Sequence, residues 1–185
     1  RDLLSYQGIK KHDVLHKLVR ALAFQIGSEV SYNELSNLLG IDKETVESYI
    51  NLLEKCFVVF RLSSFSRNMR NEIKKGKKIY FYDNGIRNAL ISNFAPLEMR
   101  QDAGALWENF MISERIKRNA YCNDYSQLFF WRTKQQQEID LIEEKDGRLF
   151  AYEFKWNSKK KSKLPTSFEN NYSDIEFKVI NKDNY

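Results

Sequence analysis

The chain has 185 residues, of which 42% are hydrophobic and 30% are charged. This balance is typical of a folded globular protein and argues against a disordered chain. The formal net charge of +5 is compatible with nucleic-acid binding but is too small an excess to indicate it. Because no apolar run is long enough to cross a membrane and no signal peptide is recognisable, we expect a cytoplasmic protein without membrane contact.

The cysteines, the lack of a phosphate-binding loop and the first residue narrow the possible classes of protein further. Cys56 and Cys122 lack metal-ligand spacing and are expected to be reduced thiols. The sequence contains no glycine-rich phosphate-binding loop, so any ATP chemistry would lie outside these residues. Since the sequence begins at Arg1 instead of methionine, we expect it to be part of a longer protein.

Helices are predicted first. Apolar residues recur at helical spacing over residues 12–26. Ser31 and Glu34 have the spacing of a capping box at the start of a short helix, which Gly40 ends. Asp42 is the expected N-cap of a third helix. Two helices joined by a short turn form a helix-turn-helix.

Two strands are predicted next, over residues 57–65 and 78–82, with a polar stretch of residues 66–78 between them. A helix-turn-helix followed by two strands and a long connecting loop predicts a winged helix. A turn at residues 83–85 and a short helix over residues 86–91 are expected to follow.

The second half predicts an α/β domain with a mixed sheet and flanking helices. A long helix is expected over residues 103–118, with Asp102 as its cap. Asp146-Gly147, within a connection over residues 143–148, predicts a hairpin. The domain boundary is placed near residues 96–102, which gives domains of residues 1–98 and 99–185. Strands are expected over residues 128–133, 138–142, 149–156 and 175–180, and a short helix over residues 167–171.

An acid and a lysine share one face of the strand over residues 149–156. Side chains alternate along a strand, so Glu153 and Lys155 point away from the aromatic side chains around them. Asp140 lies alongside them once the hairpin closes, and Glu108 on the long helix would add a third carboxylate. The alternative is a solvated hairpin face on which Lys155 pairs with Glu153.

Clustered carboxylates repel one another unless a cation compensates, and Mg²⁺ or Mn²⁺ is the natural oxygen-liganded partner. Such a metal polarises a phosphoryl oxygen and activates a water molecule. Asp140 and Glu153 are the expected metal ligands, with Glu108 as a further ligand or outer acid. Lys155 would orient or help to deprotonate the water and stabilise developing charge. The pattern favours phosphodiester hydrolysis.

The order Asp140…Glu153-x-Lys155 resembles the PD-(D/E)XK restriction-endonuclease superfamily, although Ile139 stands where the motif's proline would precede the acid. The chain is also similar to the C-terminal region, of unknown function, of a family of prokaryotic AAA-type ATPases. This resemblance implies an upstream ATP-binding domain, a winged helix and a nuclease-like module with Glu108, Asp140, Glu153 and Lys155 at its site positions. The segments that carry it are Arg1-Asp2-Leu3, Gly40-Ile-Asp-Lys-Glu-Thr-Val46, Tyr80-Phe-Tyr-Asp-Asn-Gly85, Gly104-Ala-Leu-Trp-Glu108-Asn-Phe110, Phe130-Trp-Arg-Thr133, Glu138-Ile-Asp140 and Tyr152-Glu-Phe-Lys155.

Two groups of basic residues are candidates for phosphate contact, one in the predicted wing and one after the Glu-x-Lys strand. The predicted third helix instead carries Glu44, Glu47 and Glu54 outward, so reading of base sequence is not expected. A solvated loop without a partner is the alternative for both groups. The expected nucleic-acid-binding residues are Arg67, Arg70, Lys74, Lys75, Lys77, Lys78, Lys159, Lys160 and Lys161.

Two functions stay open. In the first, the chain is the C-terminal part of an AAA-type ATPase and carries a Mg²⁺- or Mn²⁺-dependent DNA endonuclease. In the second, it is a catalytically silent module that binds nucleic acid or protein and positions this partner for the ATPase domain. The expected partners are DNA and the upstream ATPase domain, which would bind the ATP, and modules of this kind often pair as homodimers.

Overall fold

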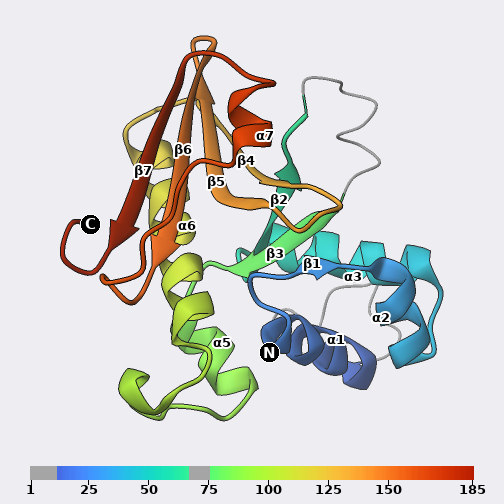
Figure 1. Ribbon diagram of the computed structural model, residues 1–185. Coiled ribbons are helices and arrows are strands. Elements are labelled where there is room, and N and C mark those ends of the chain that lie inside the picture. Colours follow the sequence, from blue (N-terminus) through green and yellow to red (C-terminus); the bar gives the residue numbers. More distant parts are fainter. Residues whose placement is uncertain (1–11, 67–75) are drawn as a thin grey trace. The chain divides into compact units, whose positions relative to one another are not determined.

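The computed structural model describes residues 12–66 and 76–185, which form a mixed α/β protein with seven strands (Figure 1). Within these ranges, residues 12–61 and 77–95 form one compact unit, and residues 62–66, 76 and 96–185 form a second. The chain passes from the first unit to the second within β2 (Val59–Ser64). The predicted α/β class is confirmed at this level.

The first unit is mainly helical. Its β1 pairs antiparallel with β3, with Glu29 opposite Lys78. The apolar faces of its helices bury Leu18, Leu22 and Ile50 completely or almost completely. Besides the start of β2, its elements are α1 (His12–Phe24), β1 (Glu29–Val30), α2 (Tyr32–Leu39), α3 (Lys43–Lys55), β3 (Lys77–Phe81) and α5 (Asn84–Leu90).

The predicted caps of α2 and α3 are confirmed. The Ser31 side chain accepts a hydrogen bond of 3.3 Å from the Glu34 backbone N–H, and Asp42 Oδ1 accepts one of 2.7 Å from the Thr45 N–H. Gly40 lies between the two helices with φ +64°, in the left-handed region that favours glycine. Local capping therefore explains why the chain turns sharply between α2 and α3.

The second unit is a twisted sheet with helices on both of its faces. From the end of β2 the strand order continues β4-β5-β6-β7, with parallel pairing of β2 with β4 and of β6 with β7 and antiparallel pairing between. Figure 1 shows α6 behind the strands and α7 in front of them. The elements after β2 are η2 (Leu97–Met99), α6 (Ala103–Tyr121), β4 (Gln127–Arg132), β5 (Glu138–Lys145), β6 (Arg148–Lys155), α7 (Thr166–Glu169) and β7 (Ile175–Asn181).

The hairpin between β5 and β6 is tighter than predicted. Asp146 and Gly147 both have positive φ, 50° and 78°, which suits a two-residue turn between twisted strands. Strand pairing therefore continues up to the turn, with Lys145 opposite Arg148. The predicted connection over residues 143–148 is wrong in its extent, and Glu143 belongs to β5.

Asp102 stands at the N-cap position of α6, as expected, but its side chain makes no capping hydrogen bond. The carboxylate accepts hydrogen bonds from Arg100 Nε at 2.8 Å and from Arg100 Nη2 at 2.9 Å. The prediction of a side-chain cap is therefore wrong, because a charge-assisted fork with a nearby arginine occupies this carboxylate.

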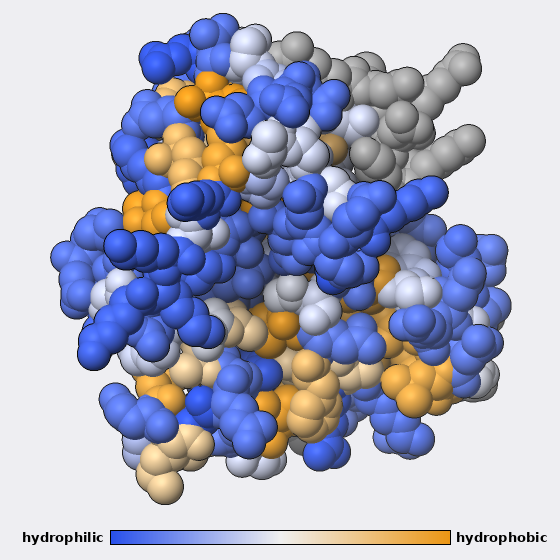
Figure 2. Space-filling model, viewed as in Figure 1, coloured by the Kyte–Doolittle hydropathy of each residue, from blue (hydrophilic) through white to orange (hydrophobic). Residues whose placement is uncertain are grey.

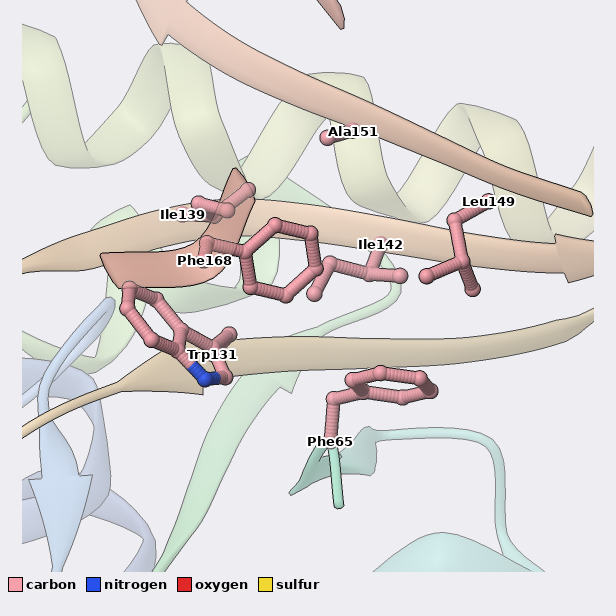
Figure 3. Packing of buried hydrophobic residues seen from close by; sticks show 7 residues of the cluster. All are labelled: Phe65, Trp131, Ile139, Ile142, Leu149, Ala151 and Phe168. Atoms are coloured by element: carbon pink, nitrogen blue, oxygen red, sulfur yellow. The ribbon is translucent and has the colours of Figure 1, made fainter. Parts of the chain in front are cut away.

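An aromatic cluster packs α7 onto the sheet (Figure 3). Phe168 of α7 is fully buried, with its ring 5.0 Å from that of Trp131 and 4.5 Å from that of Tyr172. Ile142 of β5 and Ala151 of β6 belong to the same buried cluster and contribute the surface of the sheet on which α7 packs. The short helix α7 is thus held by tertiary packing, since so few residues cannot form a stable helix alone.

Hydrophilic residues predominate on the face shown in Figure 2, and hydrophobic residues form separate groups between them. Scattered exposed apolar side chains of this kind are normal in folded proteins. None of the helices in the described ranges combines the length and the apolar character needed to span a membrane.

Phe168→Ala is expected to lower the free energy of unfolding by about 3 to 5 kcal/mol, because it leaves a cavity among buried rings. Tyr125→Ala is the control, since Tyr125 in the same unit is 90% exposed, and it should change stability by at most about 0.5 kcal/mol. Urea denaturation measures both. Equal losses in the two variants would contradict the role of this cluster.

Candidate active site

The pairing of β5 with β6 brings two acids together. Leu141 lies opposite Tyr152, so the next positions along the two strands are Asp140 and Glu153. Asp140 Oδ2 accepts a hydrogen bond of 2.8 Å from the backbone N–H of Phe154. One carboxylate oxygen therefore takes the place of a backbone carbonyl oxygen as the hydrogen-bond acceptor, and this fixes the Asp140 side chain beside β6.

Lys155 completes this group. Its Nζ lies 2.5 Å from Glu153 Oε2 and 3.9 Å from Asp140 Oδ2. The structure thus brings together three of the four residues that the sequence singles out, with an ammonium group beside both carboxylates.

The group is largely shielded from water, with Asp140 8% exposed and Glu153 5% exposed. Burial, and then the charge of Asp140, raises the pKa of Glu153. Burial would lower the pKa of Lys155, but the hydrogen bond to Glu153 and the charges of Asp140, Glu153 and Glu108 outweigh it and raise this pKa. Lys155 is therefore a cation at neutral pH.

Glu108, on α6, is near enough to Lys155 to favour its charged form. It does not join the two strand acids in a three-ligand group, since no three His, Cys, Asp or Glu side chains of the described residues are placed to hold a metal. Mg²⁺ commonly uses only one or two protein carboxylates, with waters and substrate phosphates as its other ligands. Asp140 and Glu153 fit that smaller requirement, and Glu108 fits the role of an outer acid.

The loop after β6 returns to the site. Ser162 Oγ donates a hydrogen bond of 3.4 Å to Glu153 Oε2, the oxygen that Lys155 also contacts. Lys159, Lys160 and Lys161 precede Ser162 in this loop and are exposed. Sequence reasoning missed Ser162, because no pattern indicates that a loop residue nine positions after an acid folds back onto it.

The residues expected to contact phosphates from the wing have different positions. Arg67, Arg70, Lys74 and Lys75 lie outside the described residues. Lys77 is partly exposed, with its Nζ 5.8 Å from the centre of the Tyr32 ring. Lys78 is only 1% exposed, so its ammonium group is not on the surface where a phosphate contact would require it.

A third buried carboxylate, Glu143, was missed. Glu143 is 2% exposed, and its Oε2 accepts a hydrogen bond from Arg115 Nε at 2.9 Å. Its Oε1 accepts hydrogen bonds from Asn119 Nδ2 at 2.9 Å and from Ser126 Oγ at 2.6 Å. Arg115 and Asn119 are on α6, so this carboxylate ties the helix to β5. Sequence reasoning placed Glu143 in the connection between two strands and had no signal for its partners.

Burial alone would raise the pKa of Glu143, but the hydrogen bonds from Arg115, Ser126 and Asn119 outweigh it and lower this pKa. A carboxyl with a lowered folded-state pKa stabilises the fold above its unfolded-state pKa. This stabilisation is lost as the pH falls through the folded-state value.

Glu143→Gln should therefore lower the free energy of unfolding by about 3 kcal/mol at neutral pH, because it leaves the Arg115 charge unpaired. The difference from the wild type should shrink as the pH falls below the ordinary carboxyl value of 4.5. Denaturation across a pH series measures this. Glu144→Gln, one position along β5, is the control, with an expected change within about 0.5 kcal/mol. A difference that grows towards acid would contradict the assignment.

Comparison with known proteins relates both halves to families without an assigned function. Residues 1–97 match the family described as Domain of unknown function (DUF8612). Residues 103–183 match the family described as Domain of unknown function (DUF4143). The two matches meet near the division between the compact units after residue 95.

Three relatives are described as uncharacterized proteins. One from Mycobacterium tuberculosis is 31% identical over 139 residues, covering 74% of this chain and 31% of the relative. One from Haemophilus influenzae is 25% identical over 183 residues, covering 94% and 42% respectively. One from Methanocaldococcus jannaschii is 35% identical over 78 residues, covering 42% and 16%.

The chain thus spans less than half the length of these relatives. No solved structure matches it. Because the first family model covers more than half of the chain, the protein belongs to the family described as Domain of unknown function (DUF8612), and its second half matches DUF4143.

Proposed function

We propose that the second unit is a metal-dependent nuclease module of the PD-(D/E)XK type, acting on DNA. The observation that carries this proposal is the position of Lys155 Nζ beside the buried carboxylates of Asp140 and Glu153. A solvated hairpin face would leave these groups in water, where such pairing contributes little. Two buried acids with a partly buried lysine beside them suggest a chemical role instead.

Asp140 and Glu153 would hold a Mg²⁺ or Mn²⁺ ion, which would polarise a phosphoryl oxygen and activate water when bound. Lys155 would stabilise negative charge that develops on the phosphate. Its raised pKa favours this role over that of a proton acceptor. Glu108 would favour the charged form of Lys155 from α6.

The basic loop supports a phosphodiester substrate. Lys159, Lys160 and Lys161 are exposed, and their loop contacts Glu153 through Ser162. Positive charge beside an acidic metal site attracts a polyanion that the acids alone would repel. These lysines would therefore hold the DNA backbone.

For the first unit we propose a winged helix, based on the order α2, α3, β2 and β3. The outward side of α3 is unsuited to reading bases, since Glu54 forms an ion pair with Arg61, and Asn51 accepts a hydrogen bond of 2.5 Å from the same guanidinium. Contact with phosphates or with a protein suits this unit better than base recognition.

For the whole protein we propose an AAA-type ATPase with this chain as its C-terminal part. DUF4143 is commonly a C-terminal region of such ATPases, and the relatives are more than twice as long as the matched region. ATP would bind outside this chain.

A catalytically silent binding module is the second candidate. The specific observation in its favour is that the Lys155 ammonium already lies beside both carboxylates, so the group contains a cation of its own. Such a module would bind DNA equally well with and without divalent metal.

The chain is expected to nick supercoiled plasmid in the presence of Mg²⁺ or Mn²⁺ and not with EDTA. Asp140→Asn and Lys155→Met should each reduce nicking by at least about 100-fold, because the first removes a proposed metal ligand and the second removes the positive charge that would stabilise the reacting phosphate. Gel analysis of plasmid forms measures the rates.

Asp124→Asn is the matched control, since Asp124 pairs with Lys145 at 2.8 Å near the opposite end of the hairpin. It should cleave at the wild-type rate. Metal-independent nicking, or nicking that survives in both site variants, would contradict the nuclease proposal. DNA binding without cleavage, unchanged by Lys155→Met and by EDTA, would support the silent module.

The basic loop is tested by a triple substitution of Lys159, Lys160 and Lys161 by alanine. Loss of three phosphate contacts should reduce the slope of log affinity against log salt by about 2 to 3. Fluorescence anisotropy with duplex DNA measures the slope. A triple alanine control at Lys117, Lys178 and Lys182 removes the same charge elsewhere, and an equal reduction there would contradict a specific role for the loop.

A further inference from the structure

A cavity of about 380 Å³ lies beside α6, on the face of the sheet opposite the three-residue group. Tyr152 and Phe154 of β6 line it, and they alternate along the strand with Glu153 and Lys155. Its volume is in the range of small-molecule sites. The cavity is therefore separate from the candidate active site, although one strand serves both.

Two arginines of α6 line the cavity together. Arg115 and Arg118 are three residues apart, which places them on the same side of the helix. Arg115 uses Nε and Nη2 to bind Glu143, and its Nη1 has no acceptor among the described residues. Arg118 makes one long hydrogen bond, of 3.5 Å from Nη1 to Asn119 Oδ1.

Glu143 already pairs with Arg115, but no acid neutralises Arg118 within the described residues. Glu114 also lines the cavity, but it pairs with Lys117 at 2.7 Å. Arg118 has no carboxylate partner in the described part of the chain. Positive charge is thus in excess at this edge of the cavity, and the planar guanidinium groups have the donor geometry that phosphate accepts.

The rest of the lining is aromatic and aliphatic. Phe154 and Leu141 form apolar walls, and the Tyr185 ring stands at the rim, 73% exposed. Tyr185 meets the ring of Trp107 edge to face at 5.3 Å, which holds it in a defined orientation. Tyr152 OH accepts a hydrogen bond of 3.2 Å from Arg115, so its own proton can be donated to a ligand.

We infer that this cavity binds a nucleotide unit, with the base packed against Phe154 and Tyr185 and the phosphate held by Arg115 and Arg118. The aromatic surface suits any base, since stacking on a ring is tolerant of base identity. A free mononucleotide and the phosphorylated end of a strand share this chemistry. The inference does not depend on cleavage, because the cavity uses neither Asp140 nor Glu153.

The full 185-residue chain is titrated by calorimetry, in EDTA, with each of the four deoxynucleoside monophosphates. At least one should bind with a dissociation constant below about 1 mM. The matching nucleoside and inorganic phosphate should each bind about tenfold more weakly, because each lacks half of the contacts. Absence of saturable binding by all four would overturn the inference, and the use of EDTA keeps this result separate from any nuclease activity.

Variants locate the site. Arg118→Gln should weaken binding by about threefold to fivefold, since Arg118 is exposed and its ion pair is screened by water. Tyr185→Ala should weaken it by about tenfold through the lost stacking, and Tyr185→Phe should retain it.

Arg148→Gln is the matched control, because Arg148 is exposed on the same domain, over Phe150, and does not line the cavity. Equal weakening in Arg118→Gln and Arg148→Gln would mean general charge attraction and would overturn the site. Competition by a 5′-phosphorylated oligonucleotide then separates the two sources. Displacement at lower concentration than the mononucleotide supports a strand end, and weaker displacement supports a free nucleotide.

Discussion

The antiparallel pairing of β5 with β6 is the constraint on which both candidate sites depend. The tight turn at Asp146-Gly147 sets its register at one end, and the hydrogen bond from the Phe154 N–H to Asp140 holds it at the other. Alternation along β6 then sends Glu153 and Lys155 to one face and Tyr152 to the other. A shift of one residue would exchange these faces and remove both sites at once.

A buried carboxylate fixes the position of the long helix α6 relative to this hairpin. Glu143 accepts hydrogen bonds from Arg115 and Asn119, two residues one helical turn apart. A buried ion pair of this kind adds little net stability compared with an apolar pair, but it specifies one arrangement, because any other leaves charges unsatisfied. The helix carries Glu108 towards one site and Arg118 towards the other, so this contact serves both proposals.

The three-residue group combines features that a purely structural ion pair does not need. Burial raises the pKa of Glu153, and Asp140 lies close enough to raise it further. One lysine stabilises both, while Ser162 and the exposed lysines before it approach from a loop. Two carboxylates face one ammonium, and under the proposed function a divalent cation would neutralise the remaining negative charge.

The sequence by itself determined the features that depend on neighbouring residues: the caps at Ser31 and Asp42, the turn at Asp146-Gly147 and the convergence of Asp140, Glu153 and Lys155. Each follows from backbone geometry repeated over a few positions, or from one hairpin whose register the turn sets. Only the tertiary structure decided which polar side chains are buried and which residues are their hydrogen-bonding partners. Glu143 depends on α6, Lys78 is buried in β3, and Ser162 folds back onto Glu153. These contacts form when separate elements of the chain pack together. Periodic patterns in the sequence predict single helices and strands, but not which elements pack against each other.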